Sequence, residues 1–203
     1  MPVPKSKTVF ISGSAYEYGI FGEEGKTFIR HLTRALLKND FKIISGFGLG
    51  VGNHIVDEGL REMHRKNKEE ISDFLQFFPF PPAHHPGNIL SGYRDHMLSG
   101  AGIAIFIFGN KLEDIAIREA GGVLEEFRIA RRHNALLIPV GASGYVSQKI
   151  WEEVMEHFDD YFDTRESYDL YRQLGRQDLH PLELIEIVIQ IALQNEKKGI
   201  RQL

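Results

Sequence analysis

The segment Ile43–Gly52 constrains the fold most, because an apolar run there ends in four glycines placed at every second position. An amphipathic stretch follows, with Ile55, Leu60 and Met63 at helical spacing. A β-branched run, a glycine turn and an amphipathic segment, in this order, place bare backbone N–H groups at a helix start, where phosphate groups bind. Glycine suits such a turn because no Cβ blocks a phosphate, and because some turn positions require a positive φ. Packing alone could also explain the glycines, so both readings stay open.

A second glycine turn of the same kind ends the first apolar run of the chain, where Thr8–Ser12 is followed by Gly13 and Ser14. Five such runs read as strands, and the most apolar of them is expected at the centre of a sheet, buried on both faces. The expected strands are residues 8–12, 41–45, 74–78, 102–108 and 135–140. Helical spacing of apolar residues predicts helices between and after them, at residues 23–37, 50–65, 89–99, about 117–132, 146–158 and from Pro181 onward. This alternation predicts an α/β, Rossmann-like, doubly wound and mainly parallel sheet of five or more strands.

Length and composition favour a single nucleotide-binding domain over residues 1–203, with a flexible start at 1–6 and an irregular segment at 159–179 before the last helix. That acidic, aromatic segment could form a lid or an interface loop. The net charge of −4 argues against binding to nucleic acid. The sequence has no cysteine and no apolar run near the ~20 residues of a membrane span. We therefore expect a soluble cytoplasmic protein without membrane or nucleic-acid partners, and a closed homo-oligomer as the default assembly.

Glycines and polar side chains follow the carboxyl ends of all five expected strands, or lie one helical turn beyond them. In a doubly wound sheet, ligands bind at these ends, where the winding reverses. A loop that includes residues 84–88 is expected after the third strand, because three prolines precede it. The predicted ligand-binding residues are Ser12, Gly13, Ser14, Gly46, Phe47, Gly48, Gly87, Asn88, Arg94, Asn110, Lys111, Gly122 and Glu126.

Three charged residues in this set suggest the chemistry of the site. Arg94 can bind phosphate oxygens as a planar fork, and Lys111 can bind them as a point charge. Glu126 follows Gly122 by four residues, so both lie on one helix face and the glycine leaves room beside the carboxylate. Such a carboxylate can accept hydrogen bonds from ribose hydroxyls, or serve acid/base catalysis at a glycosidic bond. We expect Arg94, Lys111 and Glu126 to converge over the two glycine turns, although Lys111 could also be a solvated turn residue.

A metal site is not expected, because the histidines show no ligand spacing apart from the adjacent pair His84-His85. No cofactor is expected either, and no catalytic nucleophile is obvious.

With these residues in view, the chain resembles the SLOG superfamily, a Rossmann-like group that includes the LOG phosphoribohydrolases and the DprA DNA-binding proteins. The run Gly122–Glu126 aligns with the Gly-Thr-x-x-Glu ending of the LOG motif, and Arg94 aligns with the LOG arginine. The Pro-Gly-Gly that opens the LOG motif is Arg118-Glu119-Ala120 here, and Val123 replaces the threonine. This resemblance implies an alternative function, a nucleotide N-glycosidase with Arg94 and Glu126 as its catalytic pair.

The chain is more similar to the SLOG sensor domains of Thoeris antiphage effectors, in which this domain follows a sirtuin-like NADase domain. The spacing from Arg94 to Lys111 to Glu126 makes this match specific. The resemblance implies that Ser12 or Ser14, together with these three residues, binds a cyclic ADP-ribose isomer made by a TIR protein. Binding would activate NAD depletion by the sirtuin-like effector domain, and the chain itself would not be an enzyme. We expect either an excised sensor domain or a stand-alone relative, assembled as a homodimer or a larger oligomer.

Overall fold

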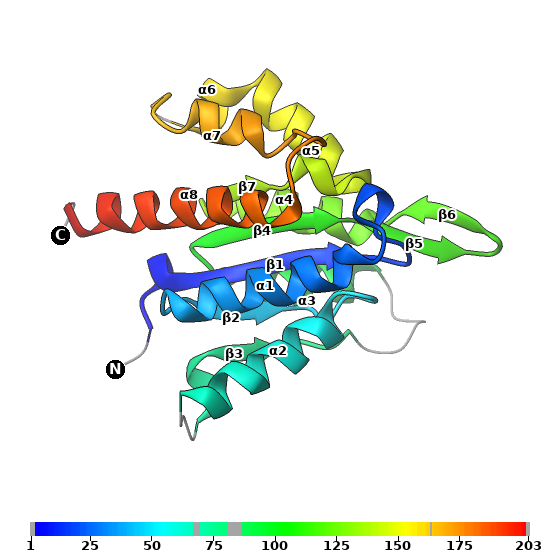
Figure 1. Cartoon of the computed structure of the whole chain (residues 1–203), viewed down its shortest axis with the longest axis horizontal. Coiled ribbons are helices and arrows are strands. Elements are labelled where there is room, and N and C mark those ends of the chain that lie inside the picture. Colours follow the sequence, from blue (N-terminus) through cyan, green and yellow to red (C-terminus); the bar gives the residue numbers. More distant parts are fainter. Residues whose placement is uncertain (1–2, 67–69, 81–86, 163, 202–203) are drawn as a thin grey trace.

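The computed structural model describes residues 3–66, 70–80, 87–162 and 164–201, with side chains at 3–66, 70–80, 89–162 and 164–194. Five parallel strands form one sheet in the order β3-β2-β1-β4-β7 (Figure 1). Their bounds are β1 (Thr8–Ser14), β2 (Lys42–Ser45), β3 (Leu75–Phe77), β4 (Ile103–Phe108) and β7 (Leu136–Pro139). All five expected strands are confirmed, and the chain reverses its winding between β1 and β4.

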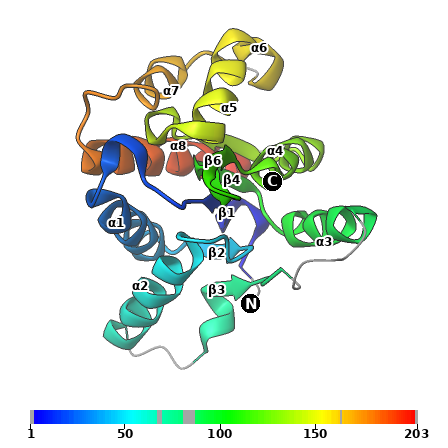
Figure 2. The ribbon, with the colours of Figure 1, turned by 90° about the vertical axis from the view of Figure 1, so that its right-hand side faces the viewer.

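Helices cover both faces of the sheet, as the alternating pattern predicts. Viewed along the strands, α1 (Glu24–Lys38) and α2 (Gly52–Arg65) lie on one side, and α3 (Gly87–Ser99) and α4 (Gly121–Arg132) lie on the other (Figure 2). The C-terminal helix α8 (Pro181–Arg201) packs beside α1, and α5 (Tyr145–Glu156) packs against β4. This doubly wound arrangement confirms the α/β, Rossmann-like fold.

Burial of apolar side chains fixes the centre of the sheet. Every residue of β4 is fully buried, because β1 and β7 flank it and helices cover both faces. The register pairs Val9 with Ile103 and Ser14 with Phe108, so β1 and β4 end together. The turns that follow these two strands therefore open at the same edge of the sheet.

The predicted start of one helix is wrong. The helix expected from about Ile117 begins only at Gly121, and a two-stranded antiparallel hairpin precedes it, formed by β5 (Asn110–Glu113) and β6 (Ala116–Glu119). The hairpin projects beyond the carboxyl ends of the sheet strands (Figure 1). Positive φ angles at Gly109 (104°) and Asp114 (57°) turn the chain into and within the hairpin. Because its strands are largely exposed, apolar spacing gives no sign of them.

The segment expected to be irregular, 159–179, also differs from the prediction. It contains most of α6 (Phe158–Tyr161) and all of α7 (Tyr168–Gln173), which pack through aromatic rings. Phe158 lies 5.0 Å from Tyr168 and 5.5 Å from Tyr171 between ring centroids. α6 and α7 are too short to show the apolar spacing that identifies longer helices, and these ring contacts hold them in place.

Short 3₁₀ turns complete the described chain. They cover η1 (Lys5–Lys7), η2 (Gly19–Phe21), η3 (Ile71–Asp73) and η4 (Gly141–Ser143). The first of these overlaps the start that was expected to be flexible, whereas residues 1 and 2 lie outside the described residues. Residues 84–86 of the expected loop also lie outside them, and residues 87–88 already belong to α3.

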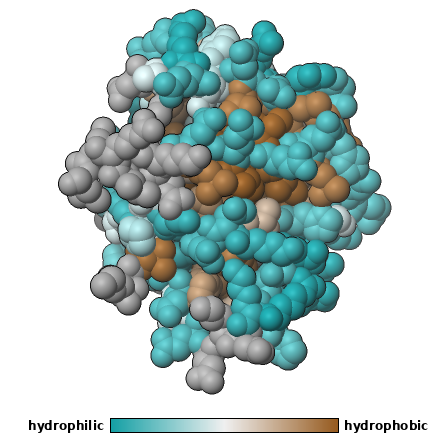
Figure 3. All heavy atoms as spheres, turned by 60° about the vertical axis from the view of Figure 1, so that its left-hand side comes forward, coloured by the Kyte–Doolittle hydropathy of each residue, from teal (hydrophilic) through white to brown (hydrophobic). Residues whose placement is uncertain are grey.

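Apolar side chains reach the surface between α1 and α8, where a groove of about 560 Å³ includes Ala35, Ile185, Ile189 and Leu193 in its lining. Figure 3 shows apolar surface on this side of the molecule. None of the predicted site residues lines this groove. Among the described helices, none is both long and apolar enough to cross a membrane.

Candidate functional site

The two glycine turns pack directly against each other at the carboxyl edge of the sheet. A Cβ at Gly48 would lie 2.0 Å from the carbonyl oxygen of Gly13, and a Cβ at Gly13 would lie 2.8 Å from that of Ile107. The backbone N–H of Ala15 donates a 2.7 Å hydrogen bond to Leu49 O, which joins the turns. The packing role left open by the sequence is therefore confirmed for Gly13 and Gly48, and phosphate binding remains a prediction.

A cavity of about 170 Å³ lies beside these turns and brings together seven of the predicted residues. They are Gly13, Ser14, Gly46, Gly48, Arg94, Gly122 and Glu126. Ile11, Phe80, Ala120 and Val123 complete the lining. Typical small-molecule sites have volumes of about 300–1,000 Å³, so this cavity is smaller than most of them. A dinucleotide-sized ligand would therefore extend out of the cavity or enlarge it.

Arg94 on α3 reaches across to α4 and is held on several sides. Its Nη1 donates a 2.7 Å hydrogen bond to Oε2 of Glu125, and its Cζ lies 4.7 Å from the centroid of the Phe80 ring. A Cβ at Gly122 would lie 2.8 Å from Nη2, so glycine makes room for the guanidinium. Nε is buried without a hydrogen-bond partner among the described residues, although it lies 3.5 Å from Oε1 of Glu126.

Glu126 is the buried carboxylate of the site. Ser12, at the end of β1, donates a 2.6 Å hydrogen bond to its Oε2. Burial raises the pKa of Glu126 to about 7 and outweighs the opposing effects of the Ser12 hydroxyl and the Arg94 charge. Near neutral pH this carboxyl group can therefore either accept or donate a proton.

Lys111 does not converge with Arg94 and Glu126 in this structure. It lies on the hairpin strand β5, where its Nζ is 3.2 Å from Oε1 of Glu113, and its side chain is 42% exposed. The expected convergence is wrong because the strand does not end in a simple turn: Gly109 leads the chain into the projecting hairpin.

Asn110 is buried, but its side chain serves the backbone. Its Oδ1 accepts hydrogen bonds from the N–H groups of Tyr16 and Glu17, and its Nδ2 donates to Glu17 O. It therefore fixes the loop after β1 to the hairpin and does not face the cavity. The hairpin base stays close to the site, since Ser14 Oγ donates a 2.8 Å hydrogen bond to Asn110 O.

Phe47 also lies outside the cavity lining. Phe47 is 44% exposed, has a φ of 59° and packs edge-on against Phe77 with ring centroids 6.2 Å apart. Gly87 and Asn88 begin α3, and the surroundings of both residues lie outside the described part of the structure, so their predicted role stays a prediction.

Two contacts of Arg94 were not predicted from the sequence. Phe80 is the aromatic residue of the Pro79–Pro82 segment, which indicated only a loop, and its ring stacks on Arg94. Glu125, the neighbour of Glu126, is not among the residues predicted for the site. The rotation of α4 decides between them: Glu126 is buried, whereas the side chain of Glu125 is 35% exposed and binds Arg94.

Larger cavities lie elsewhere. One of about 970 Å³ is lined by Tyr16, Tyr18 and His54, among others, and includes Ala15 and Leu49 of the two turns. Tyr18 donates its hydroxyl to Gly50 O at 2.9 Å and packs edge-on against a core phenylalanine, which is a packing role.

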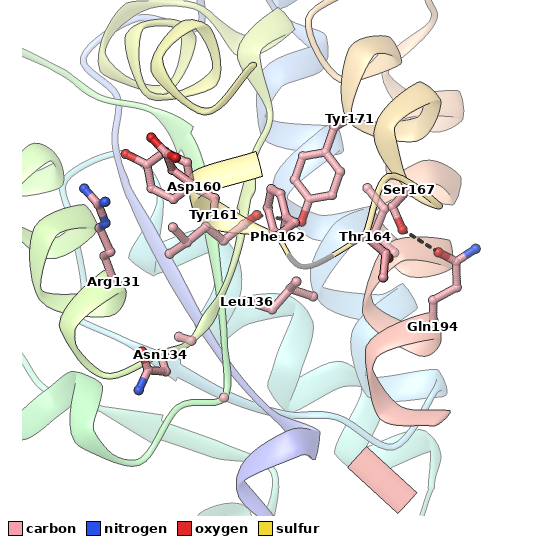
Figure 4. Close-up of a pocket in the computed structure, with 14 residues that line it drawn as sticks. Arg131, Asn134, Leu136, Asp160, Tyr161, Phe162, Thr164, Ser167, Tyr171 and Gln194 are labelled. Carbon is pink, nitrogen blue, oxygen red and sulfur yellow. Dashed lines mark hydrogen bonds between the residues drawn. The ribbon is translucent and has the colours of Figure 1, made fainter. Parts of the chain in front are cut away.

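Another cavity, of about 580 Å³, includes Gly102 and Leu136 in its lining, at the amino ends of β4 and β7 (Figure 4). Two phenol groups in it are already engaged: Tyr171 donates to Leu137 O at 2.7 Å, and Tyr161 donates to Glu153 at 2.6 Å. The predicted glycine turns lie at the opposite edge of the sheet. Throughout the described residues, no group of three or more His, Asp or Glu could hold a metal ion.

Comparison with known proteins identifies the family. Residues 3–195 match STALD, described as the Sir2- and TIR-associating SLOG family. The chain belongs to this family. The SLOG resemblance and the Rossmann-like fold predicted from the sequence are thereby confirmed.

Several STALD relatives carry the name NAD(+) hydrolase ThsA. The protein from Bacillus cereus (strain MSX-D12) is 36% identical over 189 residues, which cover 92% of this chain and 40% of the relative. The protein from Cytobacillus dafuensis is 42% identical over 161 residues, which cover 76% of this chain and 33% of the relative. This STALD chain therefore spans only about a third to two fifths of the length of these curated relatives.

Proposed function

We propose that the chain is a regulatory sensor domain, one that binds a cyclic ADP-ribose isomer and activates an NAD-depleting effector in antiphage defence. The signal would come from a TIR protein, and the effector would be a sirtuin-like NADase domain. The family description and the name of the ThsA relatives support this proposal, because they link SLOG domains to Sir2, to TIR and to NAD hydrolysis. In this proposal the chain binds its ligand without turnover and acts in the cytoplasm as a homo-oligomer.

The observation that carries the proposal is the convergence of Arg94 and Glu126 beside the two glycine turns, with Ser12 bound to the carboxylate. A cyclic ADP-ribose carries two linked phosphates and two riboses. The Arg94 guanidinium and the turn N–H groups suit the phosphates, and the carboxylate of Glu126 suits ribose hydroxyls. The ligand needs no nucleophile for binding.

Lys111 extends this proposal beyond the cavity. Because the cavity holds only about 170 Å³, a ligand of this size would reach its rim, and the hairpin base lies there through the Ser14–Asn110 hydrogen bond. We expect Lys111 to contact an outer phosphate. Lys111→Ala should therefore weaken binding less than Arg94→Ala, since the lysine is exposed and the arginine is mostly buried.

Isothermal titration calorimetry with cyclic ADP-ribose isomers tests the proposal, with NAD and linear ADP-ribose as comparison ligands. The wild-type chain should bind one cyclic isomer, and Arg94→Ala should lose most of that affinity. Arg172→Ala is a matched control, because Arg172 is exposed on α7 and pairs with Asp169 at the surface. Failure of the wild-type chain to bind any cyclic isomer would remove the proposed function.

One observation favours a second candidate, a LOG-type nucleotide N-glycosidase. Glu126 has a pKa of about 7 and lies beside a cation, an environment suited to a general acid or base. Incubation with AMP separates the two functions, since only a glycosidase releases free adenine. The sensor proposal predicts no release, and release that Glu126→Gln abolishes would favour the enzyme instead.

A further inference from the structure

We propose that Glu125 is an internal competitor for the phosphate-binding edge of Arg94, and that it sets both the affinity and the charge selectivity of the site. Glu125 accepts from Arg94 the hydrogen bond that a phosphate oxygen would accept. The identity of the natural ligand in this inference rests on the proposed function.

The guanidinium of Arg94 has little freedom to move toward an incoming anion. Phe80 stacks on it at 4.7 Å, Gly122 on α4 lies close to Nη2, and its side chain is only 13% exposed. A phosphate must therefore bind the guanidinium in its present position. The Nη1 corner is already occupied, because Glu125 Oε2 lies 2.7 Å from it.

Carboxylates and phosphates compete for the same N–H groups of arginine, because both accept charge-assisted hydrogen bonds in the plane of the guanidinium. The two carboxylates next to Arg94 differ in how easily they can leave. Glu126 is buried and held by Ser12, whereas Glu125 is 35% exposed and can turn into water. Glu125 is therefore the group that an anion would displace.

The balance of charge around Arg94 also indicates that an anion must displace Glu125. Arg94 contributes one positive charge, Glu125 one negative charge, and Glu126 a fraction of another at neutral pH. A diphosphate that enters while Glu125 stays in place meets a site with no net positive charge. A ligand must supply enough negative charge to replace Glu125, so the site should favour diphosphates over neutral nucleosides.

The test compares the wild-type chain with Glu125→Gln, which removes the charge and keeps the shape of the side chain. Isothermal titration calorimetry uses two probes: inorganic diphosphate, which needs only the cation, and a cyclic ADP-ribose isomer. We expect Glu125→Gln to bind both about tenfold more tightly. The control is Glu119→Gln, which removes an exposed carboxylate that pairs with Lys149, and it should change affinity less than twofold.

The outcomes separate this inference from the proposed function. Tighter diphosphate binding by Glu125→Gln, with no binding of the cyclic isomer to either protein, supports the competitor role and removes the proposed function. A cyclic isomer bound equally or more weakly by Glu125→Gln removes the competitor role and leaves the function standing. No binding of either probe to either protein removes both. If Glu125→Gln shows a lowered melting temperature, Glu125→Ala is titrated as well and should tighten binding in the same direction.

Discussion

Glu126→Gln tests the electrostatics of the site without any ligand. In the folded chain the carboxyl group is buried, and its pKa is raised from 4.5 to about 7. Since a pKa unit corresponds to about 1.4 kcal/mol, the folded state loses up to about 3 kcal/mol when Glu126 must ionise. Glutamine carries no charge at any pH and keeps an oxygen for the Ser12 hydroxyl, so the variant avoids this loss.

The direction of the pH dependence of stability follows from which state, folded or unfolded, keeps the proton on Glu126. Between pH 4.5 and about 7 the folded chain keeps the proton on Glu126, whereas the unfolded chain releases it. The stabilising contribution is thus fully present below pH 4.5 and is lost as the pH rises through 7. Relative to Glu126→Gln, the free energy of unfolding of the wild-type chain should fall over this interval.

Urea unfolding of both proteins at half-unit steps from pH 4.5 to 8.5 measures this difference. Subtracting the two curves removes the titration of the other groups that both proteins share, and Glu152→Gln on α5 serves as a control at an exposed carboxylate. A difference that stays within about 0.5 kcal/mol across the range would refute the reasoning. A wild-type chain that gains relative stability with rising pH would show that Arg94 and Ser12 outweigh burial, and would place the pKa of Glu126 below 4.5.

Three further predictions follow from the packing. Gly48→Ala should lower the free energy of unfolding by about 1–3 kcal/mol in urea titrations, because its Cβ would lie 2.0 Å from Gly13 O, and an unchanged midpoint would contradict the packing of the two turns. Gly122→Ala should leave the melting temperature nearly unchanged but weaken diphosphate binding at least tenfold, because its Cβ would displace the Arg94 guanidinium. Unchanged affinity would show that Arg94 does not bind the anion from this position. Asn110→Ala should cost about 2–3 kcal/mol and speed hydrogen exchange at the amides of residues 16 and 17, which lose their acceptor, and protection equal to wild type would assign that loop another anchor.

The sheet could be predicted from the sequence because burial decides it. Each sheet strand lies within a short, mainly apolar run, and β4 is buried on both faces, so its continuous apolar sequence is a direct consequence of its place. The β5–β6 hairpin has no such signal. Its strands, Asn-Lys-Leu-Glu and Ala-Ile-Arg-Glu, show no regular alternation and mostly stay exposed. The hairpin depends instead on Gly109 and on Asn110, whose side-chain partners lie more than 90 residues away.

The site could be predicted in part for the same reason. Ser12 and Glu126 meet because the carboxyl end of β1 and the start of α4 open at one edge of the sheet, which the topology dictates. Which of Glu125 and Glu126 faces the cavity depends on the rotation of α4, which the sequence leaves open. Lys111 was misplaced because its position depends on the hairpin.

Locating the bound ligand tests the central claim most directly. In a crystal structure of the chain with a cyclic ADP-ribose isomer, we predict a phosphate against the guanidinium of Arg94, with Glu125 turned away, and a ribose hydroxyl on the carboxylate of Glu126. Density for the isomer in the 580 Å³ cavity at the amino ends of β4 and β7, with Arg94 still bound to Glu125, would contradict the account.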